Sequence, residues 1–308
     1  MFYVIGGSNI DIYCKSYNEL IMKDSNPSKI SFSFGGVARN ICVNLSNLTS
    51  DVCLVTAFGN DYFAKLIKDD LKEKGININY SVNSREDSSS IYMAILNIDD
   101  MLLGMNDMSV IDRIDKSAID RLEDIVNEDD YVVLDTNLSK EMIEYILTNL
   151  KGAKVCDSIS ANKVGKLEGI TDNINILKMN LLEASTLAHK DLKTSNDIKD
   201  FLATISKQGN NEVLITQKDC VYIGENGKVY MYQHNAYNNM PVNVTGAGDA
   251  LISVYAFSRS KNKSIDDSIF LALAASIKTV EVNDPVYKYD LTLLEKLVKE
   301  IEIKKEIL

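Results

Sequence analysis

Two kinds of apolar segment alternate along most of this chain. Short runs rich in β-branched residues predict buried strands at 2–5, 52–57, 131–134, 153–156, 174–178 and 212–215. Between them, apolar residues at helical spacing predict helices at 37–48, 62–74, 119–126, 140–150, 181–187 and 197–207. This order is typical of βαβ units, so we expect an α/β fold with a mostly parallel, doubly wound central sheet.

Two segments interrupt this rhythm. Residues 10–34 contain I-D-I-Y-C and K-I-S-F-S-F, and residues 89–106 contain S-I-Y-M-A-I-L-N-I. Alternating apolar and polar residues are typical of half-buried strands. We expect a small antiparallel β-lid, formed by about 10–34 and 88–107, within a single domain of residues 1–308. An ordinary edge of the main sheet is the alternative.

The last third of the chain changes character. The runs on either side of the turn E-N-G predict a β-hairpin over 219–233. The remainder shows helical spacing, with expected helices at 250–258, 265–280 and 291–303.

Charge narrows the class of partner. The 308 residues include 44 acidic and 33 basic side chains, for a formal net charge of -11. Nucleic-acid binding requires a basic surface, so it is disfavoured. A small anionic ligand would have to be held by backbone N–H groups and a divalent cation.

Targeting and redox signals point to a cytoplasmic protein without a membrane partner. The N-terminus lacks a basic segment followed by a long apolar run, and no window approaches 18 uninterrupted apolar residues. The 5 cysteines are scattered and predict buried thiols rather than a zinc site. With only 2 histidines, a Ser-His-Asp triad or a histidine metal cluster is improbable.

The stretch V-T-G-A-G-D-A at 244–250 joins a glycine-containing turn to the start of a helix. Helix N-termini expose about four unpaired N–H groups and attract anions. One interpretation is a simple turn with Asp249 as a cap. The other is an anion hole at Gly246, Ala247 and Gly248, with Asp249 as a general base in the first helical turn.

Two further stretches carry side chains suited to small ligands. S-F-G-G-V-A-R-N at 33–40 predicts either a tight turn, with Arg39 and Asn40 on a solvated face, or a backbone that approaches a polyhydroxylated ligand held by Asn40. K-M-N-L-L-E at 178–183 predicts a capping box between Asn180 and Glu183, whose oxygens could also hold hydrated magnesium.

Taken in order, S-N-I-D at 8–11, G-G-V-A-R-N, K-M-N-L-L-E and V-T-G-A-G-D-A resemble the motifs of the ribokinase-like (PfkB) carbohydrate kinases. The resemblance covers essentially the whole chain. It implies a three-layer α/β sandwich with a small β-lid that often also forms a dimer clasp. D-S-N-P-S-K-I at 24–30 and M-N-D-M at 105–108 resemble the family members that act on pseudouridine.

The resemblance also implies roles for individual residues. Asp249 would be the general base, beside an anion hole at Gly246, Ala247 and Gly248. The ribose would contact the N-terminal motifs, and the base would face the lid: Asn9, Asp11, Gly35, Gly36 and Asn40 for ribose, Asn106 and Met108 for uracil, and Lys163 as a further contact. Asn180, Thr216 and Asn283 would bind nucleotide, and Asp157 and Glu183 would organise Mg²⁺ through water.

Departures from the family pattern affect the cofactors. T-Q-K-D-C at 216–220 places Lys218 and Cys220 where relatives usually have glycine, and Ala38 stands where some have glycine. Asn243 stands where many relatives carry an aspartate that helps to bind a monovalent cation, so a K⁺ site at Asn243 and Thr245 would have a neutral ligand.

The expected function is therefore ATP- and Mg²⁺-dependent phosphorylation of the 5′-hydroxyl of a nucleoside, pseudouridine first, by a homodimer joined through its lids. A kinase of ribose or of another nucleoside or sugar is the alternative. A third hypothesis is a nucleoside-binding protein without catalysis.

Overall fold

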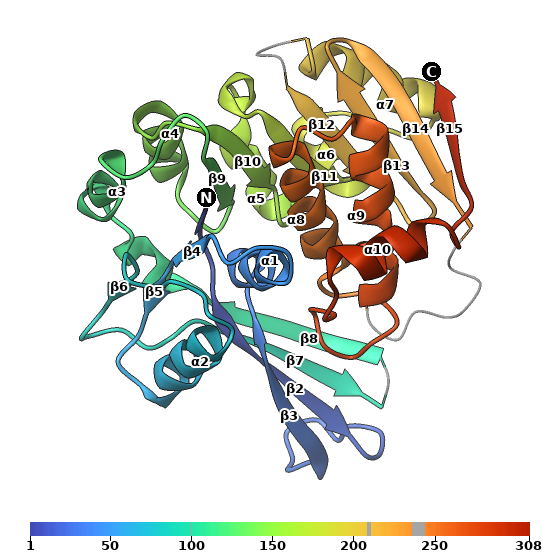
Figure 1. Ribbon diagram of the computed structural model, residues 1–308. Helices are drawn as coiled ribbons and strands as arrows, with labels where there is room; N and C mark the ends of the chain where they lie inside the picture. Colours follow the sequence, from blue (N-terminus) through green and yellow to red (C-terminus); the bar gives the residue numbers. More distant parts are fainter. Residues whose placement is uncertain (99, 208–210, 236–243) are drawn as a thin grey trace.

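A nine-stranded sheet forms the middle layer of the molecule (Figure 1). The computed structural model describes residues 1–98, 100–207, 211–235 and 244–308. Six neighbouring strands of this sheet run parallel, and the three strands at 220–225, 228–234 and 303–307 are added antiparallel at one end. In spatial order the strands are β15 (Ile303–Ile307), β14 (Lys228–His234), β13 (Cys220–Glu225), β12 (Glu212–Thr216), β11 (Ile176–Asn180), β10 (Ala153–Asp157), β9 (Tyr131–Asp135), β1 (Phe2–Ile5) and β4 (Val52–Val55).

Alternate side chains of these strands belong to two separate hydrophobic cores. Phe2 and Val4 of β1 pack into one core, and Tyr3 and Ile5 into the other. The first core is completed by α1 (Val37–Ser46), α2 (Tyr62–Glu73), α8 (Ala247–Ser260), α9 (Ile265–Thr279) and α10 (Leu291–Val298). The second is completed by α3 (Lys116–Glu123), α4 (Lys140–Asn149), α5 (Ala161–Val164), α6 (Leu181–Leu187) and α7 (Ser195–Ile205). Because each helix buries one face against the sheet, the result is the expected three-layer α/β sandwich.

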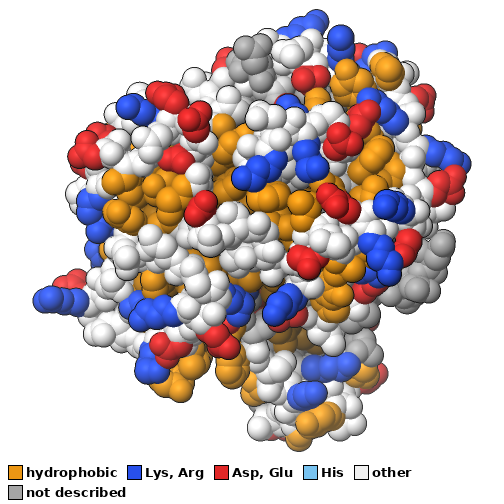
Figure 2. Space-filling model, viewed as in Figure 1, with side chains coloured by type: hydrophobic (Ala, Val, Ile, Leu, Met, Phe, Trp, Pro, Cys, Tyr) orange, Lys and Arg blue, Asp and Glu red, His pale blue; other side chains and the backbone are white. Residues whose placement is uncertain are grey.

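A second, four-stranded sheet projects from the sandwich at the bottom of Figures 1 and 2; we call it the lid. Its order is β3 (Ser28–Gly35), β2 (Asn9–Ser16), β7 (Ile91–Asn97) and β8 (Asp100–Asp107). The sheet is mixed rather than antiparallel as expected: each outer strand pairs antiparallel with its neighbour, but β2 and β7 run parallel, because the chain returns to the sandwich between β3 and β7. Register places polar residues side by side on one face: Ser33, Asp11, Tyr92 and Asn106. The opposite face carries an apolar row: Phe32, Ile12, Met93 and Met105. A short strand pair, β5 (Ala57–Phe58) and β6 (Val82–Asn83), lies elsewhere.

The structure corrects several of the sequence-based boundaries. The strand expected at 52–57 is divided at Thr56, and the one expected at 174–178 begins at Ile176 and ends at Asn180. The final helix ends at Val298, and residues 303–307 form the edge strand β15 instead. The apolar residues of this segment fit helical spacing and alternation equally well, so pairing with β14 decides its conformation.

Among the described residues, no helix is both long and apolar enough to span a bilayer. On the face shown in Figure 2, acidic and basic side chains are interspersed rather than gathered into one basic area.

Candidate active site

The N-terminus of α8 lies against the ends of β10 and β11 with very little side chain between them. Gly246 caps the helix in the left-handed conformation, with φ 85° and ψ -10°. A Cβ on Gly246 would lie 1.9 Å from the carbonyl oxygen of Pro285, and one on Gly248 would lie 2.6 Å from Lys178 Nζ. Glycine is therefore required at both positions. No side chain in the described part of the chain caps this helix, which leaves its first N–H groups for a ligand.

Asp249 is the third residue of α8, and its carboxylate is buried. Its Oδ2 accepts a hydrogen bond of 2.9 Å from Asn40 Nδ2, so the motif at 33–40 meets the motif at 244–250. Burial, followed by the charge of Asp157, raises the pKa of Asp249 to about 7, against the opposing effects of Asn40 and Lys178. A carboxylate with such a pKa is suited to accept a proton near neutral pH.

Lys178 is a site residue that the sequence analysis did not single out. Its Nζ lies 3.0 Å from Asp157 Oδ2, and the lysine side chain is 10% exposed. Burial opposes its charge, but Asp157, Glu183 and Asp249 outweigh this and raise the pKa of Lys178. The cation therefore persists beneath the α8 N-terminus. One sequence signal could have identified it: a lysine at the end of a predicted apolar strand, next to a predicted site.

Asn180 and Glu183 form the capping box that their spacing predicts. Asn180 N–H donates to Glu183 Oε2 at 2.8 Å, Glu183 N–H donates to Asn180 Oδ1 at 2.9 Å, and Ser158 Oγ donates to Glu183 Oε2 at 2.6 Å. Oxygen ligands suit Mg²⁺, which often keeps several waters. Since these oxygens already accept hydrogen bonds, the residues fit a hydrated ion. Within the described ranges, no three acidic, histidine or cysteine side chains gather closely enough to hold a metal directly.

The other predicted ribose contacts lie together where β2 meets the G-G turn. Asn9 Nδ2 donates to Asp11 Oδ1 at 2.6 Å, and both residues are buried. Burial raises the pKa of Asp11, opposed by the Asn9 hydrogen bond and by Arg39. A Cβ on Gly35 would lie 2.3 Å from Asp11 Oδ2, and Gly36 has a φ of 97°. The Asp11 carboxylate therefore packs directly against the backbone of the glycine turn.

Asp135 was also missed from the sequence. Asp135 lies fully buried at the end of β9. Its Oδ2 accepts hydrogen bonds from the N–H groups of Gly7, at 2.9 Å, and Ala38, at 3.0 Å. It therefore ties the turn after β1 to the start of α1. Burial raises its pKa, and the hydrogen bonds that it accepts oppose this.

Lys163 and Met108 lie near this same turn. Lys163 Nζ donates to Asn137 Oδ1 at 2.5 Å, and Asn137 N–H donates to Asp135 Oδ1 at 2.9 Å. A Cβ on Gly7 would lie 3.1 Å from the Met108 methyl carbon. These two predicted contacts therefore converge on one place.

The polar face of the lid carries Asn106, which is exposed and opposite Tyr92. On the same face, Tyr13 is hydrogen-bonded to Thr245; burial, with the charge of Asp11, raises the Tyr13 pKa to about 12. This contact links the lid to the turn before α8.

Asn243 lies outside the described residues. Asn283 is exposed in the loop that contains Pro285.

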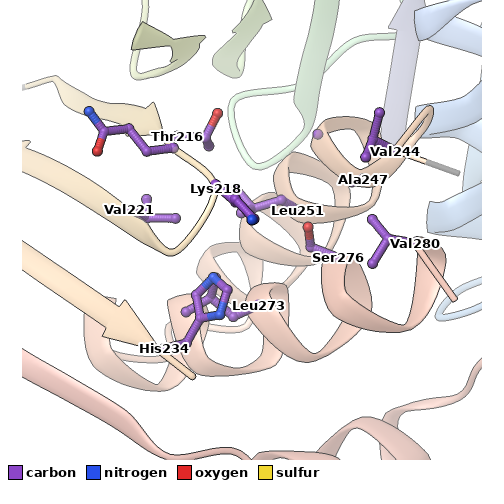
Figure 3. Close-up of a pocket in the computed structure, with 12 residues that line it drawn as sticks. Thr216, Lys218, Val221, His234, Val244, Ala247, Leu251, Leu273, Ser276 and Val280 are labelled. Carbon is purple, nitrogen blue, oxygen red and sulfur yellow. The ribbon is translucent and has the colours of Figure 1, made fainter. Parts of the chain in front are cut away.

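A pocket of about 280 Å³ opens beside the α8 N-terminus (Figure 3). In Figure 3, Thr216 and Lys218 come from the strand side and Ala247 from the start of α8. Gly248 also lines the pocket. Its walls are mainly apolar and include Val221, Leu251, Leu273 and Val280. Such a pocket fits a flat base whose phosphates extend toward the helix N-terminus. Thr216 lines this pocket, whereas Asn283 does not.

Arg39 and Asn40 are not on a solvated face, which was one interpretation of the sequence. Both are buried, with exposed fractions of 3%. Arg39 Nη2 donates to Asp70 Oδ2 at 2.7 Å, which compensates its charge.

Known proteins resemble this chain in sequence. Pseudouridine kinase from Escherichia coli (strain K12) is 32% identical over 257 residues, which covers 81% of this chain and 80% of that protein. Guanosine-inosine kinase from Exiguobacterium acetylicum is 22% identical over 292 residues, covering 90% of this chain and 93% of that protein.

Solved structures share the fold. Arabidopsis thaliana ribokinase, complexed with ribose and ATP, superposes with a TM-score of 0.82 at 20% identity, covering 97% of this chain and 98% of that chain. Ribokinase from Thermotoga maritima superposes with a TM-score of 0.79 at 17% identity, covering 97% and 99%. The family described as pfkB family carbohydrate kinase matches residues 1–287. This chain therefore belongs to the pfkB family of carbohydrate kinases, which transfer phosphoryl groups to hydroxyls of small sugars or nucleosides.

Proposed function

We propose that this protein transfers the terminal phosphoryl group of ATP to the 5′-hydroxyl of a nucleoside, with pseudouridine as the first candidate. The observation that carries the proposal is the place of Asp249, a buried carboxylate held by Asn40 at the N-terminus of a helix with no side-chain cap. The similarity to pseudouridine kinase supports the choice of nucleoside.

In this proposal, Asp249 accepts the proton of the 5′-hydroxyl as the hydroxyl oxygen attacks the terminal phosphorus of ATP. The bond between that phosphorus and the bridging oxygen breaks, and ADP leaves. Asn40 Nδ2 holds the carboxylate in place. The N–H groups at 246–249 and the ammonium group of Lys178 stabilise negative charge on the moving phosphoryl group. Bound Mg²⁺ supplies further charge neutralisation, and Asp157, Asn180 and Glu183 would hold it through water.

The nucleotide and a monovalent cation complete the proposed phosphoryl side. The pocket that includes Thr216 would take the adenine, with Asn283 as an outer contact. Thr245, together with Asn243, would hold K⁺.

The nucleoside would bind between the sandwich and the polar face of the lid. Asn9, Asp11 and Asn40, with the backbone at 35–36, would hydrogen-bond the ribose hydroxyls. Asn106 and Met108 would face the base, and Lys163 would contact the substrate. Pseudouridine carries one more ring N–H than uridine, and the Asn106 amide oxygen can accept a hydrogen bond from it.

A substrate panel tests this proposal. ADP release would be measured with pseudouridine, uridine, adenosine and ribose, using Asp249→Asn as the negative control. We expect kcat/KM for pseudouridine to exceed the others by about tenfold or more, the discrimination that one hydrogen bond provides. A preference for ribose or another nucleoside would reassign the substrate. Nucleoside binding in calorimetry without ADP release would indicate a binding protein instead.

We also propose a homodimer formed through the apolar face of the lid. Exposed fractions there are high for large side chains: Phe32 58%, Met105 58%, Ile30 68% and Leu103 48%. An apolar sheet face of this kind is typical of an interface. We expect wild type to sediment as a dimer and Phe32→Glu as a monomer. Tyr62→Glu, at an exposed aromatic residue of α2, is the control and should remain dimeric. A monomeric wild type would contradict the proposal.

A further inference from the structure

We infer that Arg39 is a positioning residue, which fixes the orientation of the Asn40 side-chain amide so that its NH₂ group faces Asp249. The inference rests on the proposed function, because it takes Asp249 as the base.

Arg39 reaches across the start of α1 to its neighbour in the sequence. Its Nη1 donates to Asn40 Oδ1 at 3.1 Å and to the Phe34 carbonyl oxygen at 3.3 Å. Asn40 Nδ2 in turn donates to Asp249 Oδ2 at 2.9 Å. The arginine side chain is only 4% exposed, so water does not compete freely for these contacts.

The chemistry of the guanidinium group gives this chain of contacts a direction. Arginine has five N–H donors and no acceptor, so the end of the Asn40 amide that faces it must be the oxygen. The other end is then the NH₂ group, which requires an acceptor at Asp249 Oδ2. A deprotonated carboxylate supplies one. Rotating the amide by half a turn would place NH₂ against guanidinium and oxygen against carboxylate, which is unfavourable at both ends.

Asp70 anchors the arginine at its far end. Arg39 Nη2 lies 2.7 Å from Asp70 Oδ2, and Asp70, with a side chain 10% exposed, also pairs with Lys74. The network therefore runs from α2 through α1 to α8. Lys74 shares the anchor, but no contact joins it to Asn40 in the described structure, so it offers a matched control.

Other charged groups around Asp249 come from the central strands and α6. The charges of Asp157 on β10, Lys178 on β11 and Asp135 on β9 shift the pKa of Asp249. The charge of Glu183 on α6 shifts the pKa of Lys178. All of them are retained in Arg39 variants. A change in the behaviour of Asp249 in such variants can therefore be assigned to the loss of Arg39, and the Asn40→Ala background separates the effect of its charge from that of the amide it orients.

The test is a double-mutant cycle of Arg39→Met and Asn40→Ala, with kcat and KM measured from pH 5 to 9. We expect Arg39→Met to lower kcat by about 10- to 100-fold with little change in the KM for ATP, because the amide no longer has a fixed direction. We expect the acid limb of kcat to move up by about one pH unit. In the Asn40→Ala background, the same change should alter kcat less than about threefold.

Controls separate positioning from folding. Lys74→Met removes another cation from Asp70 and should retain wild-type kcat. Arg39→Lys keeps a side chain that can only donate hydrogen bonds, so it should retain the acid limb of the wild-type pH profile. Arg39→Gln can donate and accept, so it no longer fixes the Asn40 amide, and the acid limb should move up. This pair decides the question if Arg39→Met does not fold.

Additive effects of Arg39→Met and Asn40→Ala, or an unshifted acid limb in Arg39→Gln, would overturn the inference. Failure of the proposed function is seen separately. If Asp249→Asn keeps its activity, Asp249 is not the base. If Asp249→Asn is inactive while Arg39→Met behaves as wild type, only the role of Arg39 is refuted.

Discussion

Asp249→Asn is expected to slow turnover strongly and also to stabilise the protein above neutral pH. The substitution keeps the shape of the side chain and an oxygen that can accept from Asn40 Nδ2. It removes a negative charge from a buried site. We expect kcat to fall by about 10²- to 10⁴-fold, the usual contribution of a general base.

The gain in stability follows from the raised pKa. Asp249 has a pKa of about 7 in the folded protein against an ordinary value of 3.8. The folded state therefore binds the proton more tightly, and the stability this provides is present below about pH 4 and lost as pH rises through 7. At about 1.4 kcal/mol per pKa unit, the free energy of unfolding of wild type falls by at most about 4 kcal/mol over this window. The Asp249→Asn variant has no carboxyl group at this position and therefore no such loss.

Chemical denaturation at pH 5 and pH 8 measures this effect. We expect the advantage of Asp249→Asn to grow by about 3 kcal/mol between these two values. Asp197 is the matched control, because it also occupies the third position of a helix, but hydrogen bonds from Lys190 and Thr194 lower its pKa. Asp197→Asn should therefore be less stable than wild type at pH 8. A pH-independent difference between Asp249→Asn and wild type would refute the electrostatic reasoning.

Two further substitutions test the surroundings of the base. Lys178→Met should lower the free energy of unfolding by about 3–5 kcal/mol, because it leaves the Asp157 carboxylate buried without its cation. Adding Asp157→Asn should restore stability in denaturation experiments but not turnover; restored turnover would exclude a role for the Lys178 charge. Gly246→Ala should lower both Tm and kcat, since the new Cβ would lie 1.9 Å from the Pro285 oxygen. Gly165→Ala, whose nearest neighbour would be 3.7 Å away, should leave both unchanged, and equal effects of the two would contradict the steric argument.

The sandwich could be predicted because its signal is local. Each central strand is apolar on both faces, so the alternation of strands and helices was visible without contacts. The turn at Gly246 was also predictable, because glycine directly before a helical run is typical of a turn. The last strand was not, because a five-residue edge strand depends on its partner β14.

Site residues whose role depends on tertiary contacts could not be identified from the sequence for the same reason. Asp135 looks like any aspartate that follows a strand, and only the fold brings Gly7 and Ala38 to it. Arg39 looks like a solvated helix residue until Asp70 of α2 is placed beside it. Lys178 could have been suspected from its position, but its partner Asp157 is on another strand. Sequence patterns therefore identify glycine turns and helix starts. Buried charged residues whose charge is compensated by a tertiary partner can be recognised only from the contacts in the structure.

The central claim is phosphorylation of the 5′-hydroxyl of pseudouridine, and phosphorus NMR of a competition reaction tests it most directly. Equal concentrations of pseudouridine, uridine and ribose would be incubated with ATP, Mg²⁺ and the protein. Phosphorus–proton couplings would identify the phosphorylated hydroxyl, and the ring-proton signals of the same molecule would distinguish pseudouridine from uridine and from ribose. We predict that pseudouridine 5′-phosphate is the first and main product. A first product phosphorylated on ribose, on uridine or on another hydroxyl would contradict the account.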